Sequence, residues 1–334
     1  MSEFRLTVAA AAEEALTECI EDQVLPRLND GRMPVRRLTH ALSPSTTSYT
    51  ADVVTVDLGD GRTLQLFVKD FSFSRLPKDD AAGRRNRELH VYRDLLDSAE
   101  LGTPAFYGSV WNDEEGRFLL VLELVDGVQL RSCGFEHWVP AAGWLGRLQG
   151  LYVRNPDRFV RSPWLLRHDE RYFASKAPAA LRNVEEVAPT AVRRLRALLS
   201  GYESLVATMA AEPATFVHGN FRPKNIIFPP PTSRPRICVV DWEVSALGST
   251  LYDLALLADG YRGEQLDRLL GAYRREAEAN GVAVPERDRT LYLLDCFCLH
   301  RVVKSLSRAV EKGFGERDVS RLLDHGETLR ARLQ

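Results

Sequence analysis

The chain has 334 residues and a mass of 37.6 kDa, with 45% hydrophobic and 27% charged residues, and this composition is typical of a globular protein. It excludes a disordered chain, a collagen-like repeat and a disulfide scaffold. No apolar run approaches the roughly 18 residues needed to cross a bilayer, and acidic residues interrupt the alanine-rich start. We therefore expect a cytoplasmic protein with no membrane partner, and five scattered cysteines fit a reducing compartment.

The formal net charge of −2 conceals an uneven distribution of charge. Residues 1–125 carry 14 basic and 21 acidic side chains, whereas residues 126–334 carry 30 basic and 25 acidic ones. The basic excess of the second part is too weak for a nucleic-acid-binding surface, which needs clustered basic residues. We expect no nucleic-acid partner.

The first 125 residues predict a small sheet with an N-terminal helix and one inserted helix. Apolar residues at helical spacing mark the helices, alternating apolar residues mark the strands, and a Gly-Asp-Gly turn joins the first two strands into a hairpin. In chain order we expect a helix over 7–28, strands over 47–58 and 63–71, a helix over 86–96, and strands over 105–112 and 118–125.

From residue 126 onward the pattern becomes mainly helical. Two short apolar strands, within 214–220 and 236–243, interrupt the helices. A β-rich part followed by a helical part predicts an α+β fold with domains 1–125 and 126–334, and with a hinge near Glu123–Gly127. The predicted helices of the second domain are 138–153, 190–210, 264–280 and 289–313.

The most informative segment runs from Val217 to Asp253. It reads VHGNFRPKNIIF and later CVVDWEVSALGSTLYDLALL. In these residues the chain resembles the aminoglycoside phosphotransferase and choline kinase family, relatives of protein kinases, whose signature is H-G-D-x-x-x-x-N, then a strand ending in Asp, then Gly and D-L-A. The resemblance implies a protein-kinase-like fold of two lobes, a small β-rich one and a larger, mainly helical one. The matching residues are His218, Gly219, Asn225, Asp241, Gly248 and Asp253-Leu254-Ala255.

Phosphoryl transfer from ATP has a loose transition state, so a protein mainly supplies cations and positioning groups. Mg²⁺ prefers oxygen ligands, and Asp241 and Asn225 are the predicted metal ligands. Lys69 lies in a predicted strand and Glu88 in the helix that follows. The resemblance implies that Glu88 holds the Lys69 ammonium against the α- and β-phosphates.

A loop over the phosphates and the hinge complete the predicted nucleotide site. No G-x-G-x-x-G motif precedes Lys69, so the predicted phosphate loop is the Ser/Thr-rich segment 43–50. The expected cofactors are ATP or GTP, with Mg²⁺. The predicted nucleotide contacts besides Lys69 and Glu88 are Ser45, Thr46, Ser48, Glu123 and Val125.

Asn220 stands where the family carries its catalytic Asp. A carboxylate accepts the proton of the acceptor hydroxyl, whereas an amide only orients that hydroxyl, and general-base help is typically worth about 10²- to 10⁴-fold. His218 is expected to support the loop by hydrogen bonding, and Arg222 to supply positive charge to the transition state. The candidate catalytic residues are therefore Asn220, Arg222 and His218, and Asp253 is expected to brace the loop.

Three explanations of Asn220 stay open. The chain is an enzyme in which Glu243 or the substrate acts as base, a pseudokinase that binds nucleotide as a regulatory or partner subunit, or a variant in which Asp was changed to Asn to trap a complex. All three retain the predicted Mg-nucleotide site.

The predicted function is transfer of the γ-phosphate of Mg-ATP to a hydroxyl of a small molecule, such as an antibiotic or a sugar, or of Ser/Thr in a precursor peptide. Polycationic acceptors would favour an acidic surface, yet residues 126–334 carry a net positive charge. We therefore expect a neutral or anionic acceptor. Candidate lining residues are Trp164, His168, Asp169 and Tyr172.

Overall fold

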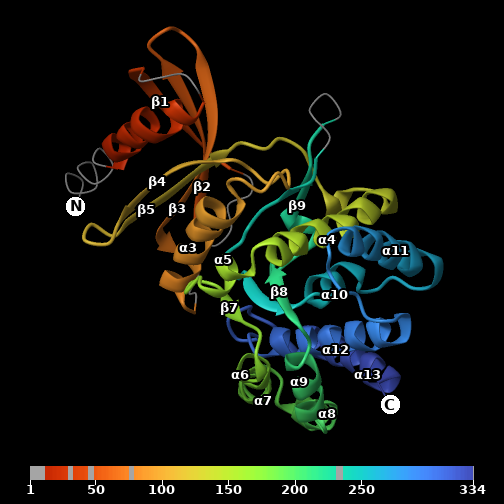
Figure 1. Cartoon of the computed structure of the whole chain (residues 1–334). Helices are drawn as coiled ribbons and strands as arrows, with labels where there is room; N and C mark the ends of the chain where they lie inside the picture. Colours follow the sequence, from red (N-terminus) through yellow and green to blue (C-terminus); the bar gives the residue numbers. More distant parts are fainter. Residues whose placement is uncertain (1–11, 29–32, 44–48, 75–78, 231–235, 334) are drawn as a thin grey trace. The chain divides into compact units, whose positions relative to one another are not determined.

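The computed structural model describes residues 12–28, 33–43, 49–74, 79–230 and 236–333 (Figure 1). Residue contacts divide the chain into two compact units, of which the first comprises residues 1–128 and 227–243 and the second comprises residues 129–226 and 244–334. The α+β fold class agrees with the prediction, because the first unit is built on a sheet and the second is mainly helical. The predicted division after residue 125 did not anticipate that residues 227–243 group with the first unit.

The first unit is built on an antiparallel sheet of five strands in the order β1-β2-β3-β5-β4. Its central strands form the predicted hairpin, and the last two form the second predicted strand pair. The unpredicted strand β1 is largely exposed, so its sequence lacks the alternation of a half-buried strand. The strands are β1 (Val35–Leu42), β2 (Tyr49–Leu58), β3 (Thr63–Ser74), β4 (Phe106–Asn112) and β5 (Arg117–Glu123).

One face of this sheet packs against the N-terminal helical segment, which spans 12–19, η1 (Ile20–Val24) and α2 (Leu25–Arg27). Ile20 and Val24 are fully buried there with Val54 and Val68 of the sheet, and burying each such side chain stabilises the fold by roughly 1.5–3 kcal/mol. Because successive strand residues point to opposite faces, Lys69 lies on the face away from this core.

The predicted second helix of this unit begins earlier than expected. It consists of α3 (Ala81–His90) and η2 (Val91–Leu96), and the Asp80 side chain caps it by accepting a hydrogen bond from the Gly83 N–H. Its first turn is rich in arginine and small residues, so periodicity alone identified only the part from residue 86 onward.

The second unit contains most of the predicted helices (Figure 1). The segment predicted as one helix over 190–210 is two, because Gly201 between them has a left-handed backbone (φ 70°). The helices are α4 (Trp138–Arg154), α5 (Pro156–Val160), α6 (Glu170–Ala174), α7 (Lys176–Val187), α8 (Val192–Leu198), α9 (Tyr202–Ala210), α10 (Tyr252–Ala258), α11 (Gly263–Ala279), α12 (Arg287–Leu306) and α13 (Glu316–Arg332), with single 3₁₀ turns at η3 (Leu130–Ser132), η4 (Phe135–His137), η5 (Pro189–Ala191) and η6 (Pro223–Asn225).

Two small sheets complete the fold. One joins β7 (Leu166–Arg167), β11 (Ala246–Ser249) and β8 (Ala214–Val217), in that spatial order, within the second unit. The other has the order β10-β9-β6, with β6 (Val128–Gln129), β9 (Ile226–Phe228) and β10 (Cys238–Val239). No helix in the described part of the chain combines the length and the apolar character needed to span a bilayer.

Candidate functional site

Strand β3 and helix α3 bring Lys69 and Glu88 into contact within the first unit. The Lys69 Nζ lies 2.6 Å from Oε2 and 2.9 Å from Oε1 of Glu88, and 3.6 Å from Oδ1 of Asp241. The Lys69 side chain is 15% exposed and that of Glu88 only 2%. Three residues selected from separate sequence motifs therefore meet in one largely buried ionic cluster.

A third carboxylate joins this cluster. Oxygen atoms of Glu88, Asp241 and Glu243 lie within 4.8 Å of one another, and Glu243 also pairs with Arg84 at 3.3 Å. Although burial favours the neutral amine, the three carboxylates raise the pKa of Lys69, while burial raises the pKa of Glu88. Oxygen donors gathered in this way fit a hard divalent cation such as Mg²⁺.

Glu243 was named from the sequence only as an alternative base, and not as a metal ligand. Its available signal was the D-W-E triplet, in which the residues on either side of Trp242 are acidic. Trp242 is fully buried, and its Nε1 donates a hydrogen bond to the Val239 carbonyl at 3.1 Å. The buried indole anchors the segment, with the carboxylates of Asp241 and Glu243 on its two flanks.

Asp241 has an unusual backbone conformation. Its φ of 72° lies in the left-handed region, which costs a residue other than glycine roughly 1–3 kcal/mol and persists only where the surroundings impose it. The predicted strand before it is also shorter than expected, because β10 ends at Val239. Asp241 thus lies two residues beyond the end of β10, in a segment without regular secondary structure.

The structure describes two of the remaining predicted nucleotide contacts, Glu123 and Val125. The Glu123 carboxylate forms an ion pair with Arg236 and accepts a hydrogen bond from the Ala105 N–H at 3.1 Å, so it is held within the first unit. Val125 is half-buried just after β5. Ser45, Thr46 and Ser48 lie outside the described residues.

In the second unit, strand β8 leads directly into the loop that carries the remaining candidate residues. The buried Asp253 carboxylate accepts hydrogen bonds from the N–H groups of His218 (2.6 Å) and Gly219 (3.0 Å). Gly219 has a φ of 77°, and a Cβ there would lie 2.2 Å from the Val244 carbonyl oxygen, so only glycine fits. Asp253 therefore braces this loop, and burial raises its pKa to about 7 even though the loop N–H groups favour the charged form.

Hydrogen bonds within the loop surround Asn220. Its N–H donates to the His218 Nδ1 at 3.1 Å, and its carbonyl accepts from the Asn225 Nδ2 at 3.0 Å. His218 is fully buried, so its ring supports the loop backbone. Asn220 is half-buried and Arg222 is exposed. The role of Asn225 as a magnesium ligand stays a prediction.

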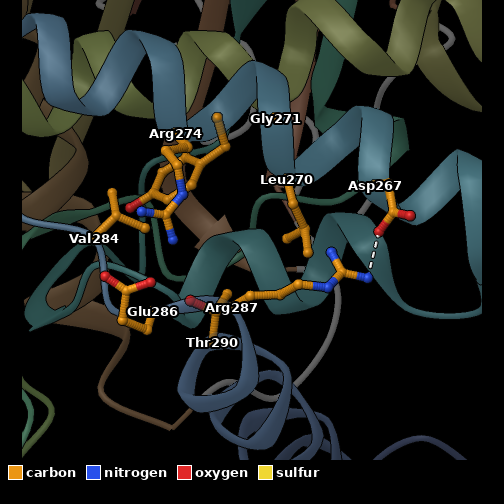
Figure 2. A pocket seen from close by; sticks show the side chains of 9 residues that line it. Asp267, Leu270, Gly271, Arg274, Val284, Glu286, Arg287 and Thr290 are labelled. Carbon is orange, nitrogen blue, oxygen red and sulfur yellow. Dashed lines mark ion pairs between the residues drawn. The ribbon is translucent and has the colours of Figure 1, made fainter.

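Helices α11 and α12 border a separate cavity of about 400 Å³ in the second unit. Figure 2 shows Arg287 reaching across its wall to Asp267, with which it pairs at 2.7 Å. None of the candidate site residues lines this cavity.

Comparison with known proteins places this chain in a family. A sequence model of the phosphotransferase enzyme family matches residues 46–291. Similar solved structures include the GDP complex of wild-type aminoglycoside 2'-phosphotransferase-IIIa, with 14% identity, a TM-score of 0.63 and coverage of 93% of this chain and 97% of that one. A choline kinase from Cryptosporidium parvum Iowa II has 12% identity and a TM-score of 0.58, and the match covers 89% of this chain and 90% of that one.

A macrolide 2'-phosphotransferase from Brachybacterium faecium has 14% identity and a TM-score of 0.56, with coverage of 96% of this chain and 98% of that one. No curated protein matches the chain by sequence. At these identities the structures show the shared fold, whereas the family match spans most of the chain. This chain therefore belongs to the phosphotransferase enzyme family, whose members transfer phosphoryl groups to hydroxyl groups.

Proposed function

We propose that this protein transfers the γ-phosphoryl group of a magnesium-bound nucleoside triphosphate, ATP or GTP, to a hydroxyl of an acceptor molecule. The observation that carries the proposal is the contact of Lys69 with both Glu88 and Asp241 in the first unit. Two similar structures support nucleotide binding, because one is a complex with GDP and the other is a ternary complex with ADP and hygromycin B.

Each side chain of the cluster has a role that its chemistry supports. The Lys69 ammonium binds phosphate oxygens, and Glu88, with two oxygens within 2.9 Å of it, sets its position. Asp241 and Glu243 offer carboxylate oxygens to Mg²⁺. When bound, the metal supplies positive charge that offsets the charge of the phosphates.

Asn220 orients the acceptor hydroxyl in this proposal, since an amide has no basicity at neutral pH. Positioning and charge stabilisation are sufficient for slow turnover, because the loose transition state needs little early removal of the proton. The same residue favours a second candidate function, a nucleotide-binding regulatory or partner subunit that does not turn over.

Nucleotide binding is tested by the thermal midpoint of the full chain with millimolar Mg-ATP or Mg-GTP. A ligand at 100 times its Kd stabilises the folded state by about 2.7 kcal/mol, so we expect a rise of several degrees. Lys69→Met should abolish the rise, whereas Arg321→Gln, a change at an exposed arginine of α13, should keep it. No rise in the wild type would contradict both candidate functions.

Turnover separates the two candidates once binding is established. Phosphate release and transfer from radiolabelled nucleotide are measured with a panel of neutral and anionic alcohols. Transfer by the wild-type chain supports the enzyme, and binding without transfer to any acceptor supports the regulatory subunit.

A further inference from the structure

A lysine between two tyrosines lies in the second unit, apart from the ionic cluster of Lys69, Glu88, Asp241 and Glu243. The Lys304 Nζ on α12 donates to the hydroxyl oxygens of Tyr172 (2.9 Å) and Tyr252 (3.1 Å), which are 3.4 Å apart. The Lys176 Nζ lies 5.0 Å from the centre of the Tyr172 ring, and the His168 ring stacks on the same ring at 4.2 Å. We name these five residues the Lys304 cluster.

The hydrogen bonds of this cluster leave donors in excess. An ammonium has three N–H donors, of which two go to the phenols. One phenol can donate to the other, so the hydrogen of the second phenol finds no acceptor within the triad. Among the described residues, no carboxylate forms an ion pair with Lys304, although its side chain is half-buried. A partly desolvated ammonium that forms no ion pair is unfavourable, and an anion bound directly to it would relieve this cost.

His168 provides a second, independent indication of a ligand. It is only 6% exposed, and within the described part of the chain neither of its ring nitrogens has a hydrogen-bond partner. Its ring lies against both tyrosines, with a centroid distance of 4.3 Å to Tyr252. Buried polar atoms are nearly always paired, so this imidazole has a hydrogen-bonding capacity that the protein itself leaves unused.

The cluster is connected to the loop that carries Asn220. Tyr252 directly precedes Asp253, whose carboxylate holds the loop N–H groups, and the charge of Lys304 acts on that carboxylate. Partial desolvation and the nearby Arg222 lower the pKa of Lys312 to about 8, and Lys304 contributes to the same effect. The charges of Lys304, Lys312 and the loop residue Arg222 therefore influence one another within the second unit.

We propose that Lys304, together with Tyr172 and His168, binds a carboxylate or phosphate group of the acceptor whose hydroxyl is phosphorylated. This inference rests on the proposed function, and it specifies that the acceptor is a small anionic alcohol. An ammonium and neutral donors bind such an oxyanion by charge-assisted hydrogen bonds, whereas a polycationic acceptor would be repelled there. The weak basic excess of residues 126–334 agrees with this preference.

Three probes that share one carbon chain and differ in charge test the subsite: glycerol 3-phosphate, glycerate and glycerol. Their dissociation constants are measured by calorimetry on the full chain. We expect glycerol 3-phosphate to bind more tightly than glycerate, and glycerol to bind far more weakly than either. Lys304→Met should weaken binding of the two anions by about 10- to 100-fold, the usual effect of losing a hydrogen bond to a charged group.

Matched variants separate a direct role from a folding defect. Lys304→Arg retains the charge and should keep most of the affinity, and Tyr172→Phe should lose less than Lys304→Met. Arg321→Gln removes one exposed charge of the same unit and should change nothing. Equal binding of glycerol and glycerol 3-phosphate, or unchanged anion binding in Lys304→Met, would overturn the subsite.

Lys69→Met distinguishes failure of the subsite from failure of the proposed function. The subsite predicts that Lys69→Met keeps glycerol 3-phosphate binding and loses Mg-ADP binding, and that Lys304→Met does the reverse. If the wild type binds no Mg-ADP but still binds the anions through Lys304, the proposed function fails and the subsite stands. If glycerol 3-phosphate binding depends on Lys69 instead, its phosphate binds at the ionic cluster of Lys69, and the proposed anion subsite at Lys304 is wrong.

Discussion

Removing Lys69 should destabilise the protein more than removing its partner Glu88. Lys69→Met takes away the ammonium that lies 2.6 Å from Glu88 and 3.6 Å from Asp241, and it leaves three carboxylates within 4.8 Å of one another. Two like charges at that separation repel by about 3 kcal/mol at an effective dielectric constant near 20. Breaking a buried ion pair from one side typically costs about 3–5 kcal/mol, and we expect a loss in this range at pH 8.

Glu88→Gln is the matched control for this prediction. It leaves Lys69 paired with Asp241 and keeps a side-chain oxygen beside the ammonium, so we expect a loss of only about 1–3 kcal/mol. The double variant Lys69→Met/Glu88→Gln should be more stable than Lys69→Met alone, because the buried Glu88 charge that has lost its ammonium is gone.

The pH dependence of the Lys69→Met defect follows from the pKa of Glu88. Burial already raises this pKa in the wild type, and losing the ammonium raises it further. A raised carboxyl pKa means that the folded state holds a proton that the unfolded state has released, so stability is lost as pH rises and regained as it falls. The gap between wild type and Lys69→Met should therefore narrow from pH 8 to pH 5.

Urea unfolding followed by circular dichroism at both pH values measures these differences. The ionic account of the cluster would be refuted if Lys69→Met were no less stable than Glu88→Gln at pH 8. It would also fail if the double variant lost as much stability as the two single variants together.

Two further predictions concern the loop of the second unit. Asn220→Asp restores a carboxylate where the family carries one, so it should raise the rate of phosphoryl transfer to a hydroxyl acceptor by about 10²- to 10⁴-fold. The rates of both forms are compared in a coupled kinase assay. Equal rates would contradict the view that the wild type lacks a general base. Asp253→Asn presents an amide N–H₂ to one of two loop N–H groups and should cost about 1–3 kcal/mol. Because burial raises the pKa of Asp253 to about 7, above the unfolded value of about 3.9, the wild-type advantage should shrink as pH rises from about 4 to 7. Urea midpoints at pH 5 and pH 8 check this, and a pH-independent difference would contradict the buried carboxyl.

Local sequence patterns predicted much of the fold. The alternation within 49–58 and 63–71 was sufficient for the β2–β3 hairpin, because one face of each strand is buried and the turn residues join them. Edge strand β1 and the arginine-rich start of α3 escaped detection, because neither presents a regular apolar pattern.

The motif residues indicated the chemistry of the site before any geometry was known. Lys69 and Glu88 were paired on the basis of the resemblance, and the structure brings their charged groups into contact. The tertiary structure added Glu243 to this cluster, and it showed the left-handed backbone of Asp241. Neither feature has a specific local signature, because the D-W-E triplet is the only sequence signal for Glu243 and acidic residues after short strands are also common in turns.

The sequence by itself determined many of the elements, the family and the identities of the reactive side chains, because periodicity and short motifs are local properties of the chain. Only the tertiary structure decided which distant segments meet. Residues 227–243 group with the N-terminal sheet, and Lys304 contacts tyrosines 132 and 52 residues earlier in the chain. Apolar patterns indicate that a face is buried, but not against which partner. The contacts of Lys69 with Glu88 and Asp241, and those of Lys304 with the two tyrosines, are therefore not encoded in any local pattern.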